Sequence, residues 1–175
     1  MASFAQKYMF LVLVLSISSS NLWARSYKIK LDDKMLSSVN QLLDKTTDFH
    51  QALYSQKQDQ IKKEIVEMNL NIDSLLKNMG DFQVQNQAMH LKRILKSTKN
   101  YLETYQNISG EESRKTNLKK AFSQMVQLIR MYQVDKKYRV FYCKDDNSEW
   151  IQEGWKAKNP IHPQKHGACG QRAYR

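Results

Sequence analysis

Four side chains suited to metal or redox chemistry lie close together near the C-terminus. Cys143 and Cys169 are the only cysteines in the 175-residue chain, and His162 and His166 fall between them. Imidazole nitrogen and thiolate sulfur are ligands that zinc and copper bind well. The pattern His-x3-His-x2-Cys, with Cys143 returning to it, therefore predicts a metal site for copper or zinc made of His162, His166, Cys143 and Cys169.

A disulfide between the two cysteines is the competing interpretation. A Cys143–Cys169 bond would pin an irregular tail to the rest of the chain, and closing that loop contributes about 3–4 kcal/mol in the chain-entropy model. It would also consume both thiolates, leaving His162 and His166 with a carboxylate or carbonyl oxygen as ligands. The residues alone leave both interpretations open.

The N-terminal segment has the features of a secretory leader. Lys7 is followed by an apolar run at 9–17, which is too short to cross a bilayer of about 30 Å. Small and polar residues follow to Ala24, after which we expect cleavage. We therefore predict a signal peptide at 1–24, a periplasmic or secreted protein and no transmembrane helix in the mature chain; an uncleaved anchor is the alternative. No cysteine stands directly after the leader, so no lipoprotein is expected, and export favours pairing of the two cysteines.

Residues 25–135 predict an all-α, up-down-up-down four-helix bundle. Glycine and proline are scarce, and apolar residues recur at three- and four-residue steps in four segments joined by short connections. These stripes run from Met35 to Leu53, from Ile61 to Met79, from Val84 to Tyr105 and from Leu118 to Tyr132. The first connection also fits a single bent helix.

Local signals mark the ends of these helices. Asp32 or Asp33 is expected to cap the first helix, and Gly80 to end the second. Ser55 with Gln58, and Ser109 with Glu112, have the spacing of capping boxes.

Residues 136–175 predict an irregular C-terminal extension, packed on the bundle as part of the same domain. Residues 138–142 alternate β-branched and aromatic side chains, which indicates a short extended segment. Residues 144–148 are expected to form a turn. Residues 149–156 are expected to form one or two helical turns that carry Trp150 and Trp155, and a loop begins at Asn159-Pro160.

The chain lacks the sequence signatures of common enzyme and cofactor classes. It contains no Gly-rich phosphate loop, no nucleophile elbow, no CxxCH haem site and no inward Glu-x-x-His pairs for a di-iron centre. We therefore expect a protein that is not an enzyme and binds neither haem nor nucleotide. His50 and His90 lie beside helical stripes and are expected to be core or surface histidines.

The positive charge favours anionic partners. The full chain carries a net charge of +11, and the predicted mature chain +10 because the leader contributes one lysine. Acidic proteins and lipid head groups are the expected partners. Nucleic acid is an unlikely partner for an exported chain without a recognisable nucleic-acid-binding module. The alternative is a solvated basic surface, since the lysines are spread along the helices.

Several short patterns in the extension resemble those of a known family. Tyr142-Cys143, Trp150-Ile151, Asn159-Pro160 and Cys169-Gly170 match its order, and the spacing from Asn159 to Gly170 fits without a gap. The family is a small periplasmic helical domain of undefined function, found alone or fused to the periplasmic adaptor subunit of copper/silver RND efflux pumps. The resemblance implies a metal-resistance role and a metal-efflux or other envelope protein as partner. We take Tyr142, Trp150, Trp155, Asn159, Pro160 and Gly170 as the structural motif of the extension.

The departures from the family pattern affect the implied metal. A Pro-Met pair after the first cysteine is replaced by Lys144-Asp145, a tyrosine by Ile161 and a glycine by Pro163, and a methionine falls on His166. Histidine in place of methionine shifts metal preference from Cu(I) toward Cu(II) or Zn(II). The alternative is that the metal role is lost and the protein is a structural or interaction module with a basic surface.

Overall fold

Four long helices and a small sheet make up the fold. The computed structural model describes residues 28–79 and 85–173, so the predicted leader and Gly80 lie outside the described residues. The long helices are α2 (Asp33–Tyr54), α3 (Gln58–Asn78), α4 (Gln85–Asn107) and α5 (Glu111–Met131). The C-terminal elements are β1 (Arg139–Cys143), β2 (Ser148–Gln152), α6 (Pro163–His166) and β3 (Gln171–Ala173).

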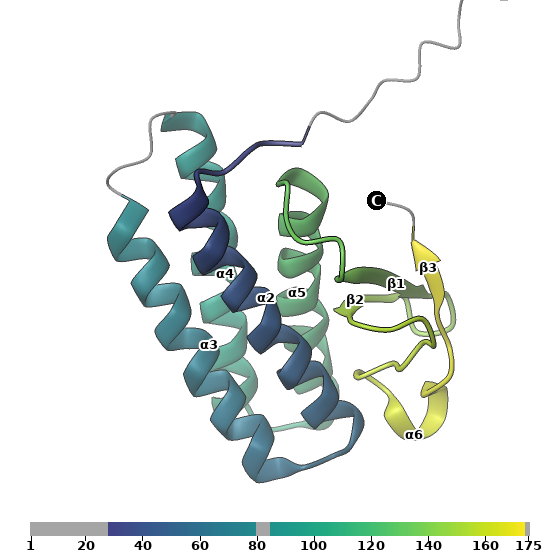
Figure 1. The fold of residues 1–175 in the computed structure, drawn as a ribbon. Helices are drawn as coiled ribbons and strands as arrows, with labels where there is room; N and C mark the ends of the chain where they lie inside the picture. The colour runs from purple at the N-terminus through teal and green to yellow at the C-terminus, as the bar shows by residue number, and fades with distance from the viewer. Residues whose placement is uncertain (1–27, 80–84, 174–175) are drawn as a thin grey trace, which may run out of the picture.

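The four long helices form the predicted up-down-up-down bundle (Figure 1). The closest pairs are α2 with α3 and α4 with α5, as expected for consecutive antiparallel helices. The first connection is a true reversal rather than a bend. Gln56 adopts a φ of 56° there, and Lys57 N donates to Ala52 O across the turn. Helices α2 and α3 are therefore separate.

The predicted helix caps are confirmed at one position and wrong at two. The Asp32 side chain accepts a hydrogen bond of 2.8 Å from Met35 N, as predicted for the start of α2. The N-cap residues of α3 and α5 are Lys57 and Gly110, and neither makes a side-chain cap. Both capping-box predictions fail for the same reason: the helices begin after Ser55 and Ser109, so each hydroxyl is out of position.

The extension is an ordered antiparallel sheet with strand order β2-β1-β3, so the all-α prediction is wrong for this part of the chain. The extended segment predicted at 138–142 is confirmed as β1. The helical turns predicted at 149–156 are wrong, because residues 148–152 form β2. Trp150 pairs with Phe141 across the strands, with ring centroids 6.0 Å apart, and this cross-strand packing outweighs the local helical signal.

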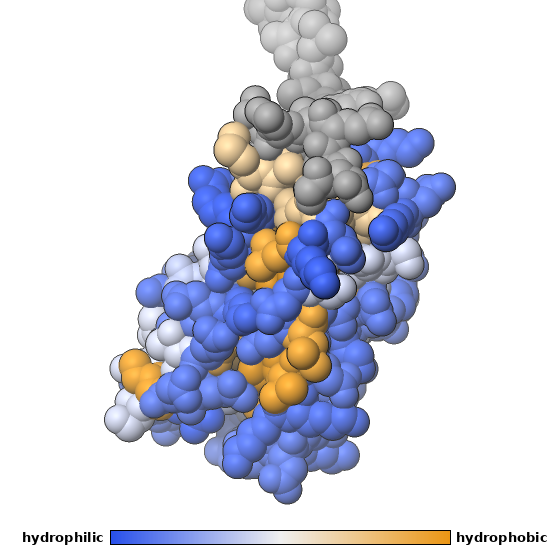
Figure 2. Space-filling model, turned by 90° about the vertical axis from the view of Figure 1, so that its left-hand side faces the viewer, coloured by the Kyte–Doolittle hydropathy of each residue, from blue (hydrophilic) through white to orange (hydrophobic). Residues whose placement is uncertain are grey.

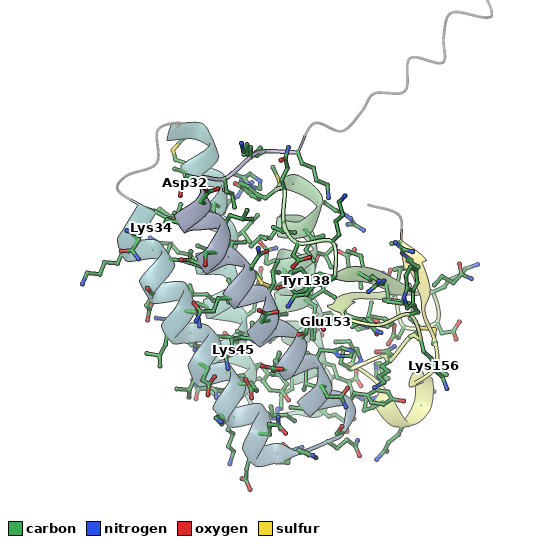
Figure 3. All side chains as sticks on the ribbon, in the orientation of Figure 1. Asp32, Lys34, Lys45, Tyr138, Glu153 and Lys156 are labelled. Carbon is green, nitrogen blue, oxygen red and sulfur yellow. A yellow bond between two sulfur atoms is a disulfide. The ribbon has the colours of Figure 1, made fainter. Side chains whose placement is uncertain are left out.

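The sheet packs on α5 and, through β2, also contacts α2. Val140, Phe141, Trp150 and Ile151 join the buried side chains of the helices in one continuous apolar core. Tyr138 lies at the junction of bundle and sheet (Figure 3), and its hydroxyl donates to Asn40 O at 2.8 Å. Buried contacts therefore seat the extension on the bundle, while the Cys143–Cys169 disulfide lies within the extension.

One face of the bundle exposes apolar side chains. Figure 2 shows a broken hydrophobic stripe on the face where α3 lies, bordered by hydrophilic residues. Val66 and Leu70 on α3 and Met89 on α4 are the large apolar residues exposed on these two helices. Within residues 28–79 and 85–173, no helix is long and apolar enough to cross a membrane.

Candidate functional site

The two cysteines form a disulfide. Cys143 ends β1 and Cys169 lies two residues before the start of β3, and their Cα atoms are 5.4 Å apart, within the usual range for a bridge. Because β3 pairs with β1, the bond joins two segments that also share a sheet. In this state neither sulfur is available as a thiolate ligand.

His162 and His166 lie at the two ends of α6 and contact each other. Their ring centroids are 5.7 Å apart and their planes are nearly perpendicular, at 85°. Each faces a carboxylate: His162 Nε2 lies 3.9 Å from Asp146, and His166 Nδ1 lies 3.8 Å from Asp145. Their side chains are only 17% and 20% exposed. The imidazoles therefore face neighbouring carboxylates rather than open solvent.

The four predicted metal ligands are not assembled into one ligand group. Among the described residues, the single group of three or more potential ligands is Cys143, Asp145 and Cys169, whose ligand atoms lie within 4.8 Å of one another. Thiolate coordination by this group requires reduction of the disulfide. In the oxidised protein, the available donors are His162 and His166 with Asp145 and Asp146.

The pKa of His162 is lowered. Burial is the largest cause, and the positive charge of Lys115 adds to it, while the carboxylate of Asp146 acts in the opposite direction. A lowered pKa keeps the imidazole neutral near pH 7. A neutral imidazole is the form that binds a metal ion.

Asn159 organises the loop that carries the histidines. Its side-chain oxygen accepts from Ile161 N at 2.9 Å, and its amide nitrogen donates to Asp146 at 2.9 Å. Its backbone N–H donates to Gly167 O. Ser148 also donates to the Asp146 carboxylate, which is only 4% exposed. The predicted motif residue Asn159 is thus a fully buried structural group that closes the loop on β2.

Trp150 and Gly170 also have packing roles. Trp150 is fully buried, and its Nε1 donates to the side chain of Gln152 at 2.9 Å. A Cβ atom on Gly170 would lie 2.8 Å from the Trp150 ring and 2.9 Å from Ala157, so only glycine fits without displacement. The Trp150 and Cys169-Gly170 patterns are therefore parts of one packing unit.

His50 links the bundle to the extension. It is buried on α2, and its Nε2 donates to the backbone oxygen of Lys158 at 2.6 Å. Burial lowers the pKa of His50 to about 4, with a smaller contribution from the charge of Lys158. Sequence analysis placed His50 near the core but gave no sign of this long-range partner.

Trp155 has an environment unlike that of Trp150. It is 70% exposed, and two guanidinium groups contact its ring: Arg139 Cζ lies 4.0 Å and Arg172 Cζ lies 4.7 Å from the ring centroid. Arg139 lies on β1 and Arg172 on β3, and their residues are not neighbours in sequence. Sequence analysis missed this cluster, because only strand pairing brings the two arginines to the same tryptophan.

We predict that the disulfide contributes strongly to stability. Replacing both cysteines (Cys143→Ala with Cys169→Ala) should lower the free energy of unfolding by about 3–4 kcal/mol, because a loop across a sequence separation of 26 is released in the unfolded chain. Urea denaturation of the oxidised protein and the double variant measures the difference. Alkylation with mass measurement should find no free thiol in the oxidised protein. Equal unfolding free energies would contradict the prediction.

We predict that His50 makes stability depend on pH. Its pKa is about 4 in the folded protein and about 6.5 when unfolded, so the unfolded chain binds the proton first. The contribution of His50 to the free energy of unfolding is fully present above pH 6.5. It is lost as the pH drops toward 4, by up to about 3 kcal/mol. His50→Gln keeps an amide donor for Lys158 O but does not titrate. Urea unfolding between pH 7 and pH 4 should show a smaller pH effect in His50→Gln; identical profiles would refute the assignment.

Comparisons with known proteins found no relatives. A scan against models of protein families, a search of curated proteins and a search of solved structures each gave no match to this chain.

Proposed function

We propose that this protein is an exported, non-enzymatic interaction module that binds an anionic surface through its C-terminal extension. The observation that carries the proposal is the stack of Arg139, Trp155 and Arg172, which we call the Trp155 stack. Tryptophan and arginine are enriched among the hot-spot residues of protein interfaces, which contribute most of the binding free energy. An exposed tryptophan held by two cations offers both apolar area and positive charge to a partner.

The surroundings of the stack support an anionic partner. Residues 136–175 contain nine lysines and arginines but only four acidic residues. All four acids have partners. Asp146 is held by Asn159, Asp145 faces His166 at 3.8 Å, Glu149 pairs with Arg130 at 3.0 Å, and Glu153 pairs with Lys137 at 3.2 Å. The extension therefore presents unneutralised positive charge around an aromatic side chain.

The stack is also preorganised. The Arg139 guanidinium donates to the Lys137 backbone oxygen at 2.8 Å, and Arg172 is positioned by the pairing of β3 with β1. Cation–π contacts with the Trp155 ring contribute about 0.5–1 kcal/mol each at exposed sites. Because the disulfide joins β1 to the start of β3, the stack depends on the oxidised state. This agrees with the predicted export to an oxidising compartment.

We predict that the protein binds vesicles containing phosphatidylglycerol but not vesicles of phosphatidylcholine alone. Arg139→Gln with Arg172→Gln should weaken vesicle binding at least tenfold, because charge and aromatic anchor act together, and added salt should weaken it further. Co-sedimentation gives the affinity, and Trp155 fluorescence should shift to the blue on binding.

The matched control removes two charges elsewhere. Lys92 and Lys96 are exposed on α4, and Lys92→Gln with Lys96→Gln changes the net charge equally. Poly-glutamate in place of vesicles tests an acidic protein partner. The proposal would be contradicted if the two double variants bound equally well. It would also be contradicted if the protein bound neither anionic probe at low salt.

Metal handling is the second candidate function, and the pairing of His162 and His166 with two carboxylates favours it. Imidazole and carboxylate together suit Zn(II) and Cu(II). The resemblance to a domain associated with copper/silver efflux pumps supports the same candidate, with an envelope efflux protein as partner. In reduced protein, Cys143 and Cys169 add two thiolates beside Asp145, a set suited to Cu(I).

We predict that oxidised protein binds Zn(II) or Cu(II) and that His162→Gln with His166→Gln abolishes this binding. Calorimetry with Zn(II) and Cu(II) on oxidised protein, and with Cu(I) on reduced protein, measures the affinities. His90→Gln is the control, since His90 lies on α4 away from the extension. No dissociation constant below about 10 µM (roughly −7 kcal/mol) in either redox state would exclude a metal role.

A further inference from the structure

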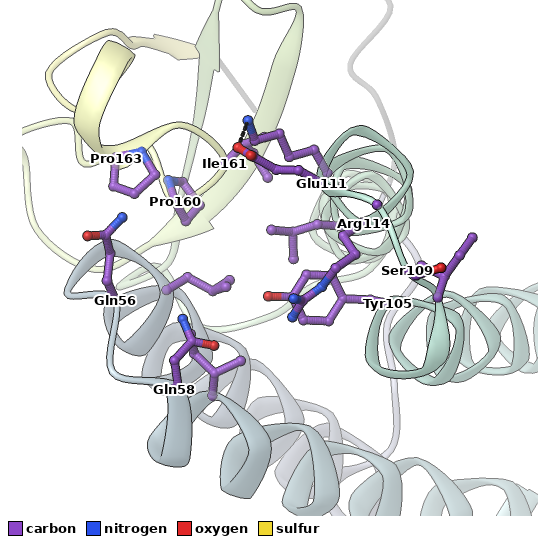
Figure 4. Close-up of a pocket in the computed structure, with 15 residues that line it drawn as sticks. Gln56, Gln58, Tyr105, Ser109, Glu111, Arg114, Pro160, Ile161 and Pro163 are labelled. Carbon is purple, nitrogen blue, oxygen red and sulfur yellow. Dashed lines mark ion pairs between the residues drawn. The ribbon is translucent and has the colours of Figure 1, made fainter.

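A cleft opens where four segments meet at the end of the bundle near α6. It has a volume of about 420 Å³, within the range of about 300–1,000 Å³ typical of small-molecule sites. Figure 4 shows its labelled residues converging from the turn after α2 and the start of α3, the end of α4, the start of α5 and the loop before α6. The cleft is built only when the extension is seated, because Pro160, Ile161 and Pro163 form one of its walls.

The walls of the cleft combine apolar and polar side chains. Hydrocarbon side chains line it from α2, α3, α5 and the extension, and include Leu53, Ile61, Leu118, Pro160 and Ile161. All five are buried in the fold. Such walls suit a ligand with a hydrocarbon or aromatic body, since its burial removes apolar area from water.

Arg114 places a positive charge at the wall of the cleft. Its guanidinium lies over the Tyr105 ring, with Cζ 4.6 Å from the ring centroid. Its Nε is buried and has no hydrogen-bond partner within the described part of the chain. A buried donor without a hydrogen bond costs free energy. The edge of a guanidinium group matches the two oxygens of a carboxylate. A guanidinium group at the wall of the cleft therefore favours a ligand with an anionic head group.

The other charges of the cleft favour a single negative charge on the ligand. Lys115 pairs with Glu111, and the lysine side chain is 21% exposed while the glutamate is 79% exposed. This pair contributes no net charge, so Arg114 sets the charge of the site at +1. A doubly charged phosphate would also meet the carboxylate of Glu111, whereas a monocarboxylate matches the site.

We propose that this cleft is a binding site for a small amphipathic monocarboxylate, with its carboxylate on Arg114 and its apolar body between Leu53, Ile61, Leu118 and Ile161. The site is separate from the Trp155 stack, whereas His162 borders it between the lining residues Ile161 and Pro163. It adds a small-molecule ligand to the binding activities proposed above.

Sodium octanoate, 1-octanol and sodium acetate are probes that separate the two parts of the proposal. In NMR titrations of oxidised protein, octanoate should shift the amide signals of 109–115 and 161–164. Octanol lacks the charge and acetate lacks the apolar body, so each should bind at least tenfold more weakly than octanoate. Octanol binding as tightly as octanoate would overturn the assignment of Arg114.

Two variants test the site, with one matched control. Arg114→Gln should weaken octanoate binding about tenfold or more, whereas Arg93→Gln, an exposed arginine on α4, should leave it unchanged. Gln58→Trp narrows the cleft without changing charge and should also weaken binding, which keeps the test valid if Arg114→Gln fails to fold. Circular dichroism and urea unfolding monitor folding. Equal affinities for Arg114→Gln and Arg93→Gln, or signal shifts confined to the exposed apolar residues Val66 and Leu70, would overturn the proposal.

Discussion

The packing of β2 against α5 is the contact on which the rest of the extension depends. Three short strands do not form a stable sheet in water without a second apolar layer. Here that layer is the bundle, and Val140, Phe141, Trp150 and Ile151 belong to the core that the sheet shares with it. The disulfide and the Asn159 loop then fix segments that the sheet has already brought together. Loss of this packing would separate Arg139 from Arg172 and open the cleft at its Pro160 wall.

Buried polar groups give this packing a single register. Asn159, Gln152 and His50 are all buried, and each makes at least one specific hydrogen bond to the extension. Satisfied polar networks fix one arrangement, because any shift leaves several donors or acceptors without partners. Arg114 differs from these three side chains, because its buried Nε has no hydrogen-bond partner within the described residues. A guanidinium group with one unsatisfied donor at the wall of a cleft is a reason to look for a ligand there.

The unusual residues of the extension divide into structural and functional sets. Trp150, Asn159 and Gly170 are used for packing, and the cysteines for a covalent link. Trp155 remains at the surface with its two arginines, and the two histidines remain beside their carboxylates. These two groups of side chains are the ones available to partners or metal ions. The proposals of an anionic-surface module and of metal handling therefore rest on different atoms and are compatible with each other.

The sequence by itself determined the four helices and the first helix cap. Apolar spacing of three and four residues marks a buried helical face whatever its neighbours are, and Asp32 acts on a backbone N–H only three residues away. It also reduced the cysteines to one possible intramolecular pair. Only the tertiary structure decided that residues 148–152 form a strand, because Trp150 is held by Phe141 across the sheet rather than by helical neighbours. The Trp155 stack, the His50–Lys158 bond and the Arg114 cleft likewise join residues far apart in the chain. Such contacts depend on how the elements pack, which local periodicity does not specify.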